Sequence, residues 1–189
     1  MGQGAGMFRL PLFLCCFLIL GPLQDALASH EASEPSDGTV RSFKPVSPPR
    51  PMPSIPFQDS EGQRITINDF SGKVVLINLW ATWCPPCIRE LPALDRLQAK
   101  FSKTDFVILP IATDREGLAL ARPFYQRLGI ENLGLYTDPE HALDAFFPMD
   151  VFPANFIINR RGELIAFLRS YVDWDAPEAE TMVKELLRR

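Results

Sequence analysis

Residues 73–87 read KVVLINLWATWCPPC, and this stretch decides the fold. Its first half, Lys73 to Trp80, is a nearly continuous apolar run, which predicts a central strand buried on both faces. Two cysteines follow, and from Cys87 to Phe101 apolar residues recur at helical spacing. The sequence therefore predicts a buried strand that turns into a helix through a cysteine pair.

The position of this pair favours redox chemistry. A cysteine attacks as its thiolate, so it needs surroundings that stabilise negative charge. At the start of a helix, Cys84 would receive free backbone N–H groups and the positive end of the helix dipole. Pro85 and Pro86 suit the first turn, which does not need their missing donors. We expect Cys84 to be the exposed attacking thiol and Cys87 the more buried resolving thiol.

The number of cysteines supports the same interpretation. The chain has four, and Cys15 and Cys16 lie in an N-terminal apolar run. A bridge between the other two would close a two-residue loop and constrain the unfolded chain very little. Zinc would need four ligands, and the only two histidines are far apart in sequence. Haem attachment needs a histidine directly after the second cysteine, where this chain has isoleucine. We therefore predict no cofactor and no metal.

The remaining pattern predicts alternating elements. Gly129 suits a helix end and Asp175 a helix start, and Asn159 to Gly162 suits a turn between antiparallel strands. The order favours a mixed three-layer α/β sheet. Strands are expected at 65–67, 106–111, 133–137, 155–158 and 163–168, and helices at 115–128, 141–147 and 176–189.

The N-terminal segment, residues 1–28, has the features of a signal peptide. Arg9 gives a weak positive start, an apolar run extends from Leu10 to Leu23, and Ala26 and Ala28 are small residues of the kind a signal peptidase recognises. The run is shorter than the ~20 residues that a spanning helix needs, which favours a cleaved peptide over an anchor.

Two further regions follow the signal peptide. Residues 29–54 are rich in proline and are expected to form an extended linker. Residues 55–189 are expected to form one folded domain. The net charge of −4 gives no basic face for nucleic acid.

Several segments together resemble the TlpA family of exported bacterial thioredoxins, which includes ResA-like and cytochrome c maturation proteins. The resemblance covers residues 55–189 and implies a thioredoxin-like three-layer fold, a mixed sheet with helices on both faces. The matching segments are 78–87, Glu90-Leu91-Pro92, Phe152-Pro153, 155–158, 161–163 and 173–178.

The resemblance also implies roles for single residues. Cys84 matches the nucleophile, Cys87 the resolving thiol, and Pro153 a cis-proline that faces their disulfide. Glu90 matches an acidic residue near the buried thiol. Its spacing places it on the Cys87 side of the helix, where a partly buried carboxylate could move protons. An exposed carboxylate without a role is the open alternative.

This chain departs from the family pattern at some positions. Asn78 stands where cytosolic thioredoxins carry a buried aspartate, and Ala154 and Asn155 replace two threonines after the cis-proline. Phe152 is bulky for a position that touches the partner. We expect Trp83 and Phe152 to contact substrate.

The resulting hypothesis is a periplasmic disulfide reductase, or redox relay, that acts on exported protein thiols. The resemblance favours cytochrome c or copper-site assembly, with electrons from a membrane thiol donor. Membrane contact is expected only through an uncleaved N-terminal segment. The direction of exchange depends on the reduction potential, so a disulfide-forming oxidant or isomerase stays open. A non-enzymatic module that binds copper or a partner also stays open.

Overall fold

The computed structural model describes residues 1–2, 38–147 and 150–189. Apart from its first two residues, the predicted signal peptide, residues 1–28, lies outside these ranges. No helix within them is both long enough and apolar enough to cross a membrane.

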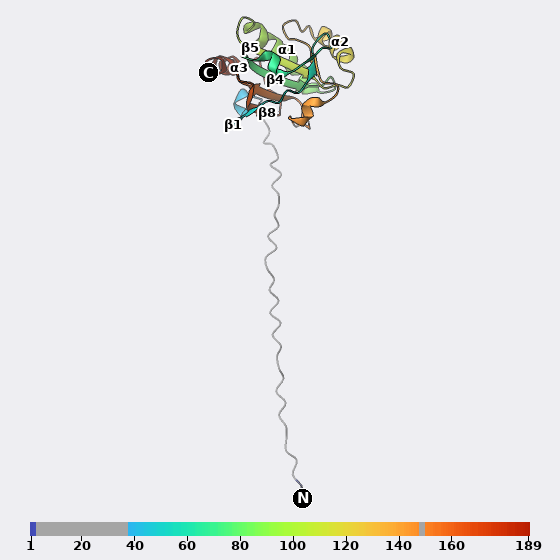
Figure 1. The fold of residues 1–189 in the computed structure, drawn as a ribbon, viewed down its shortest axis with the longest axis vertical. Coiled ribbons are helices and arrows are strands. Elements are labelled where there is room, and N and C mark those ends of the chain that lie inside the picture. The colour runs from blue at the N-terminus through green and yellow to red at the C-terminus, as the bar shows by residue number, and fades with distance from the viewer. Residues whose placement is uncertain (3–37, 148–149) are drawn as a thin grey trace. The chain divides into compact units, whose positions relative to one another are not determined.

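The fold is built on one mixed sheet of eight strands (Figure 1). The predicted central strand is β4, which pairs in parallel with β5 and antiparallel with β7. The expected hairpin joins β7 to β8. In sheet order the strands are β1 (Lys44–Pro51), β8 (Glu163–Leu168), β7 (Ala154–Ile158), β4 (Val74–Trp80), β5 (Phe106–Ala112), β6 (Tyr136–Thr137), β2 (Phe57–Gln58) and β3 (Arg64–Ile65).

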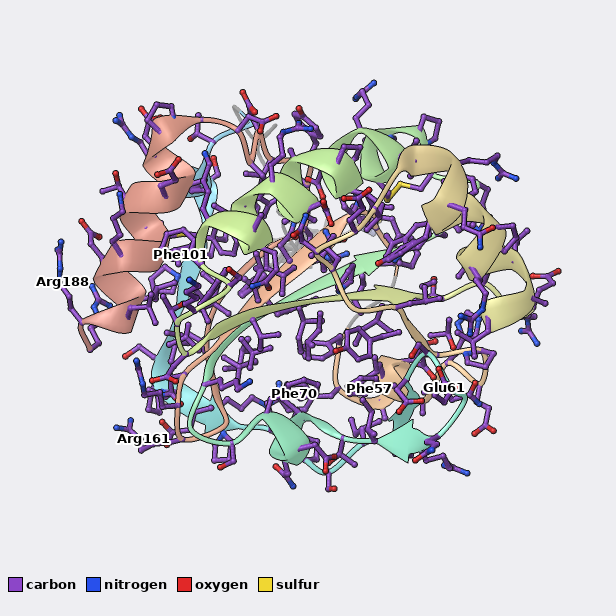
Figure 2. The ribbon with its side chains drawn as sticks, turned by 90° about the horizontal axis from the view of Figure 1, so that it is seen from above. Phe57, Glu61, Phe70, Phe101, Arg161 and Arg188 are labelled. Atoms are coloured by element: carbon purple, nitrogen blue, oxygen red, sulfur yellow. A yellow bond between two sulfur atoms is a disulfide. The ribbon has the colours of Figure 1, made fainter. Side chains whose placement is uncertain are left out.

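Every residue of β4 is buried, because both faces of the sheet are covered. On one face Leu76 and Trp80 join a cluster with side chains of all three α-helices, α1 (Pro85–Lys100), α2 (Leu118–Leu128) and α3 (Pro177–Leu187). The expected three-layer arrangement follows from this packing. Figure 2 shows the three helices on one side of the sheet.

The opposite face is covered by short elements. Ile77 of β4 packs there with residues of two 3₁₀ helices, η2 (Ile67–Phe70) and η3 (Ala142–Ala145). Phe57 and Phe70, labelled in Figure 2, lie on this side. A third 3₁₀ helix, η1 (Val40–Ser42), precedes β1. The expected helices on both faces are therefore α-helices on one face and short 3₁₀ helices, with loops, on the other.

The expected linker, residues 29–54, is wrong for residues 44–51, and its residues 29–37 lie outside the part of the chain that the structure describes. Lys44–Pro51 forms the edge strand β1, paired antiparallel with β8, so the sheet begins before residue 55. Proline lacks a backbone donor and is tolerated only where no neighbour needs one, as on an edge strand. Four prolines therefore fit here, and almost every residue of β1 is exposed.

Of two predicted helix caps, the one at the end of α2 is confirmed and the one at the start of α3 is wrong. Gly129 ends α2 in the left-handed conformation, with φ of 64°, as expected. Asp175 is not the N-cap of α3; that position is Ala176, which offers no side-chain cap. The Asp175 carboxylate instead binds the guanidinium of Arg96 on α1 through two hydrogen bonds of 2.9 and 2.6 Å.

Candidate active site

The cysteine pair forms a disulfide at the start of α1. Cys84 is the N-cap residue, Pro85 and Pro86 fill the first turn, and the Cα atoms of Cys84 and Cys87 are 5.3 Å apart. The backbone N–H of Cys87 donates to Sγ of Cys84 at 3.3 Å. This donor and the helix dipole both stabilise negative charge on Cys84 when the disulfide is opened. In Figure 2 the yellow disulfide lies at one end of α1.

Both sulfur-bearing residues are buried, which corrects the expectation that Cys84 is exposed. Its exposed fraction is 4%, and that of Cys87 is 0%. In the oxidised state the bond folds the Cys84 sulfur back into the first helical turn, and Phe152 packs against the cluster that contains it. The expected order, with Cys87 the more buried residue, matches the structure.

The loop before β7 faces the strand that leads to the cysteines. The Phe152–Pro153 peptide bond is cis, the conformation that the resemblance implied. Pro153 is buried and directly precedes Ala154, which pairs with Leu79 of β4. The sheet register thus brings the proline loop to the end of β4 from which the cysteine segment starts.

Trp83 and Phe152 meet at the entrance to this site. Their rings touch edge to face with centroids 5.6 Å apart, and Trp83 is 67% exposed. They belong to the wall of an open hollow of about 510 Å³. The hollow joins two aromatic rings to a charged surface, and its lining is Trp83, Thr113, Asp114, Arg115, Glu116, His141, Asp150 and Phe152.

A buried carboxylate holds the segment before the cysteines. The backbone N–H and the hydroxyl of Thr82 both donate to Asp114, at 3.0 and 2.8 Å. Asp114 is 5% exposed and lies two residues after the end of β5. This contact ties the cysteine segment to the loop that forms the other wall of the hollow.

Glu90 lies inside the protein, on the same side of α1 as Cys87. Its exposed fraction is 0%. One carboxylate oxygen accepts from the backbone N–H of Val172 at 2.5 Å, and the other accepts from Nδ2 of Asn78 at 3.0 Å. The structure therefore contradicts the alternative of an exposed helix carboxylate, while a catalytic role stays a prediction.

Burial raises the pKa of Glu90 to about 8, because charge is costly away from water. The hydrogen bonds from Val172 and Asn78 partly oppose this by stabilising the carboxylate. The charge of Arg89 and the nearby indole of Trp174 also lower the pKa of Glu90. The indole N–H makes no hydrogen bond of normal geometry. A carboxyl with this pKa exchanges protons near neutral pH.

The sequence did not identify the polar neighbours of Glu90. Asn78 also donates to Oδ1 of Asn155 at 2.8 Å, across the paired strands β4 and β7, and both residues are fully buried. Oδ1 of Asn78 has no hydrogen-bond partner. A lone asparagine in each of two apolar strands was the available signal, because buried amides require partners.

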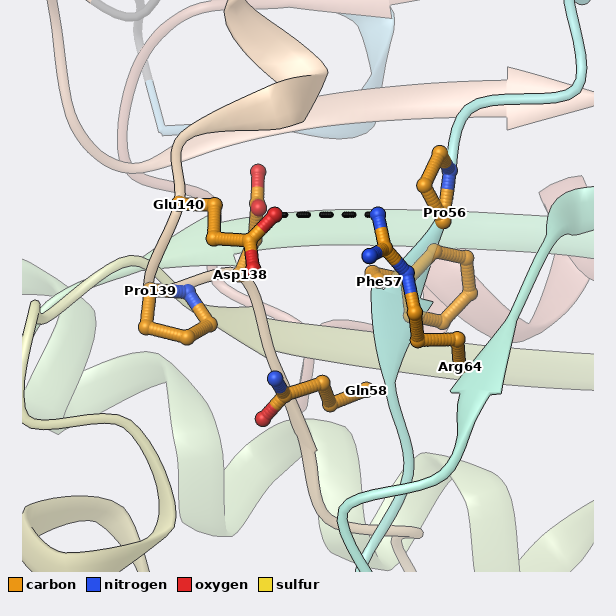
Figure 3. A pocket seen from close by; sticks show the side chains of 7 residues that line it. All are labelled: Pro56, Phe57, Gln58, Arg64, Asp138, Pro139 and Glu140. Carbon is orange, nitrogen blue, oxygen red and sulfur yellow. Dashed lines mark ion pairs between the residues drawn. The ribbon is translucent and has the colours of Figure 1, made fainter.

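Two other pockets among the described residues are far smaller than the hollow beside the disulfide. Figure 3 shows a small pocket where Arg64 of β3 faces Glu140 at 3.6 Å. Its volume of about 10 Å³ holds at most about one water molecule, and it contains no predicted site residue. Among the residues that the structure describes, no group of three or more His, Cys, Asp or Glu side chains is arranged to hold a metal.

Sequence comparison places this geometry among known proteins. The pattern of the AhpC/TSA family matches residues 48–167. The thiol-disulfide oxidoreductase ResA of Bacillus anthracis is 26% identical over 113 residues, which are 60% of this chain and 64% of that protein. ResA of Bacillus subtilis is 27% identical over 113 residues, 60% of this chain and 62% of that protein. The chain thus spans less than two thirds of the length of these relatives.

Solved structures agree on the fold. A thiol:disulfide interchange protein of the thioredoxin family from Chlorobium tepidum superposes with a TM-score of 0.62 and 24% identity, covering 75% of this chain and 99% of that one. An exposed lipoprotein thioredoxin from Streptococcus pneumoniae gives a TM-score of 0.61 and 24% identity, with 71% and 100% covered. At this identity the likeness establishes the thioredoxin-like fold.

Proposed function

The chain belongs to the AhpC/TSA family, and from this premise we propose that it is a thiol–disulfide oxidoreductase that reduces disulfides of exported proteins. The observation that carries the proposal is the Cys84–Cys87 disulfide, placed at a helix N-terminus beside a cis-proline loop and above a buried carboxyl. The names of the ResA relatives support the same chemistry.

The first step opens the partner's disulfide. The Cys84 thiolate, stabilised by the Cys87 N–H and the helix dipole, attacks one partner sulfur. The partner's S–S bond breaks, a mixed disulfide forms, and the released partner thiolate takes up a proton. An exposed partner segment reaches Cys84 once the reduced sulfur is no longer tied to Cys87.

The second step releases the partner. The Cys87 thiol loses its proton to the Glu90 carboxylate and attacks Sγ of Cys84. The Cys84–Cys87 bond forms, the mixed disulfide breaks, and the second partner sulfur leaves as a thiolate and is protonated. Two electrons have then passed from this protein to the partner. Glu90 suits the role because its pKa of about 8 is near that of a thiol.

Trp83 and Phe152 are proposed to bind the partner chain beside its disulfide. Phe152→Ala is expected to raise KM for a disulfide peptide about tenfold and to change kcat little. The lost contact binds the peptide equally in the ground state and in the transition state, and it involves none of the reacting sulfurs. Steady-state reduction of such a peptide measures this. The matched control is Phe70→Ala, because Phe70 does not line the hollow that contains Trp83 and Phe152. This variant should leave KM unchanged. An unchanged KM for Phe152→Ala would remove it from the binding surface.

The cellular setting is also a proposal. Residues 1–28 would direct export, and the mature domain would act in the periplasm on proteins of cytochrome c or copper-site assembly. A membrane thiol donor would restore the dithiol. The signal-like pattern at the N-terminus and the TlpA resemblance support this setting.

The reduction potential of the Cys84–Cys87 pair tests the direction of exchange. Equilibration of the exported protein with glutathione or dithiothreitol, after N-terminal sequencing has defined its first residue, gives this value. A potential of about −250 mV or lower is expected for a reductase. A value near −120 mV would identify an oxidant and overturn the proposed direction.

A further inference from the structure

Four residues are linked to the Glu90 carboxylate by hydrogen bonds, three of them buried and the fourth, at Ser170, partly buried. Asn78 donates to Glu90 and to Asn155 through the same Nδ2 atom. Nδ2 of Asn155 donates to the carbonyl oxygen of Ser170 at 3.3 Å. Two residues later in the same loop, the N–H of Val172 donates to the other oxygen of Glu90. Asn155 thus hydrogen-bonds both to Asn78 and to the loop of Val172, the two sources of hydrogen bonds to the carboxylate.

The direction of these hydrogen bonds is fixed at Ser170. A backbone carbonyl can only accept, so Asn155 must turn its NH₂ group toward it. Oδ1 of Asn155 then faces Asn78, so Asn78 must donate to it from its own NH₂ group. The remaining hydrogen of that group points at Glu90, and Oδ1 of Asn78 is left without a partner. An unpaired buried oxygen is costly, so Asn78 is held in this orientation against its own preference.

We propose that Asn155 is a positioning residue: by accepting from Asn78 while donating to Ser170, it keeps an N–H group directed at Glu90 and thereby favours the charged carboxylate. Without Asn155, the Asn78 amide is free to turn over. Its unpaired oxygen can then accept a hydrogen bond from the protonated form of Glu90, which favours the neutral acid.

Few other groups act on Glu90. Arg89 on α1 favours its charged form, and Tyr171, in the loop that contacts Glu90, interacts with it electrostatically. Trp174 contributes an indole, and β4 contributes only the neutral Asn78. The Cys84–Cys87 disulfide does not titrate. The oxidised protein therefore isolates the effect of the asparagine pair.

The test is the titration of Glu90 in oxidised Asn155→Leu, a variant of similar volume without polar atoms. Infrared absorption of the protonated carboxyl, assigned by its absence in Glu90→Gln, reports the fraction protonated at each pH. The Glu90 pKa is expected to rise by about one pH unit from its value near 8, because a hydrogen bond to a charged group is lost. An unchanged pKa would overturn the proposal.

Two further variants separate orientation from general packing. Ile158→Val alters the opposite face of the same strand and should leave the Glu90 pKa unchanged. A shift as large as that of Asn155→Leu would assign the effect to loosened packing and overturn the proposal. Asn78→Leu should raise the pKa by itself, and adding Asn155→Leu should raise it little further. Fully additive shifts would show that Asn155 does not act through Asn78. If Asn155→Leu does not fold, Asn155→Ala replaces it in each comparison.

The positioning of Glu90 by Asn155 does not depend on the proposed function. Only its importance for disulfide exchange rests on that function. The titration uses no substrate and no reducing partner. Wild-type protein that reduces no disulfide would refute the proposed function and leave the positioning role intact. An active enzyme with an unmoved Glu90 pKa in Asn155→Leu would do the reverse.

Discussion

Cys84→Ser is expected to abolish disulfide reduction, lowering the rate by at least about 10³-fold. Serine keeps the shape of the residue and its place at the start of α1. Its hydroxyl is not ionised near neutral pH and cannot form the mixed disulfide. The measurement is the rate at which the reduced protein opens a model protein disulfide, followed by release of free thiols.

Cys87→Ser is the matched control, because it removes the second sulfur and leaves the first. It should react once and then accumulate a mixed disulfide between Cys84 and the partner, visible by mass spectrometry as a covalent adduct. An adduct through Cys87 in the Cys84→Ser protein would instead make Cys87 the attacking residue. The greater burial of Cys87 argues against that outcome.

Glu90→Gln is expected to slow release of the mixed disulfide about 100-fold at neutral pH, within the range typical of lost general-base catalysis. The wild-type rate should rise with pH until Glu90 is ionised, near its pKa of about 8. The variant should depend on ionisation of Cys87 alone, so the two rates should converge at high pH. Stopped-flow measurement of the second step supplies both profiles, and identical profiles would remove Glu90 from the mechanism.

The same variant should change how stability depends on pH. The pKa of Glu90 is raised from 4.5 to about 8 by folding, so the folded state holds a proton that the unfolded chain releases. The free energy of unfolding should therefore fall between about pH 4.5 and pH 8, by an amount on the order of a few kcal/mol. Glu90→Gln cannot ionise and should lose this decline. Urea unfolding of the oxidised protein at several pH values measures it.

The central part of the fold could be predicted because its sequence signals are local. The short apolar run of β4 is typical of a strand covered on both faces, and every residue of this strand is buried. The cysteines follow it in the chain and must lie at its end. The hairpin of β7 and β8 was equally accessible, since Gly162 adopts a positive φ in its turn.

The remaining features depend on contacts between distant segments. The prolines of β1 suggested a linker, and only the pairing with β8 makes that segment a strand. Asp175 has the chemistry of a helix cap, but the bidentate bond to Arg96 takes its carboxylate. Burial of Glu90 depends on the Val172 loop, 82 residues further along the chain. The spacing of residues along α1 cannot show that a distant loop buries Glu90.

The edge strand β1 also affects how this protein meets other chains. An open sheet edge presents free backbone groups that can recruit a foreign strand and start aggregation. In β1 the residues Pro45, Pro48, Pro49 and Pro51 lack backbone N–H donors, which interrupts the pattern of donors along the strand. A neighbouring molecule therefore finds no continuous row of donors to pair with. We expect the proline-rich strand to disfavour β-type self-association at this edge of the sheet.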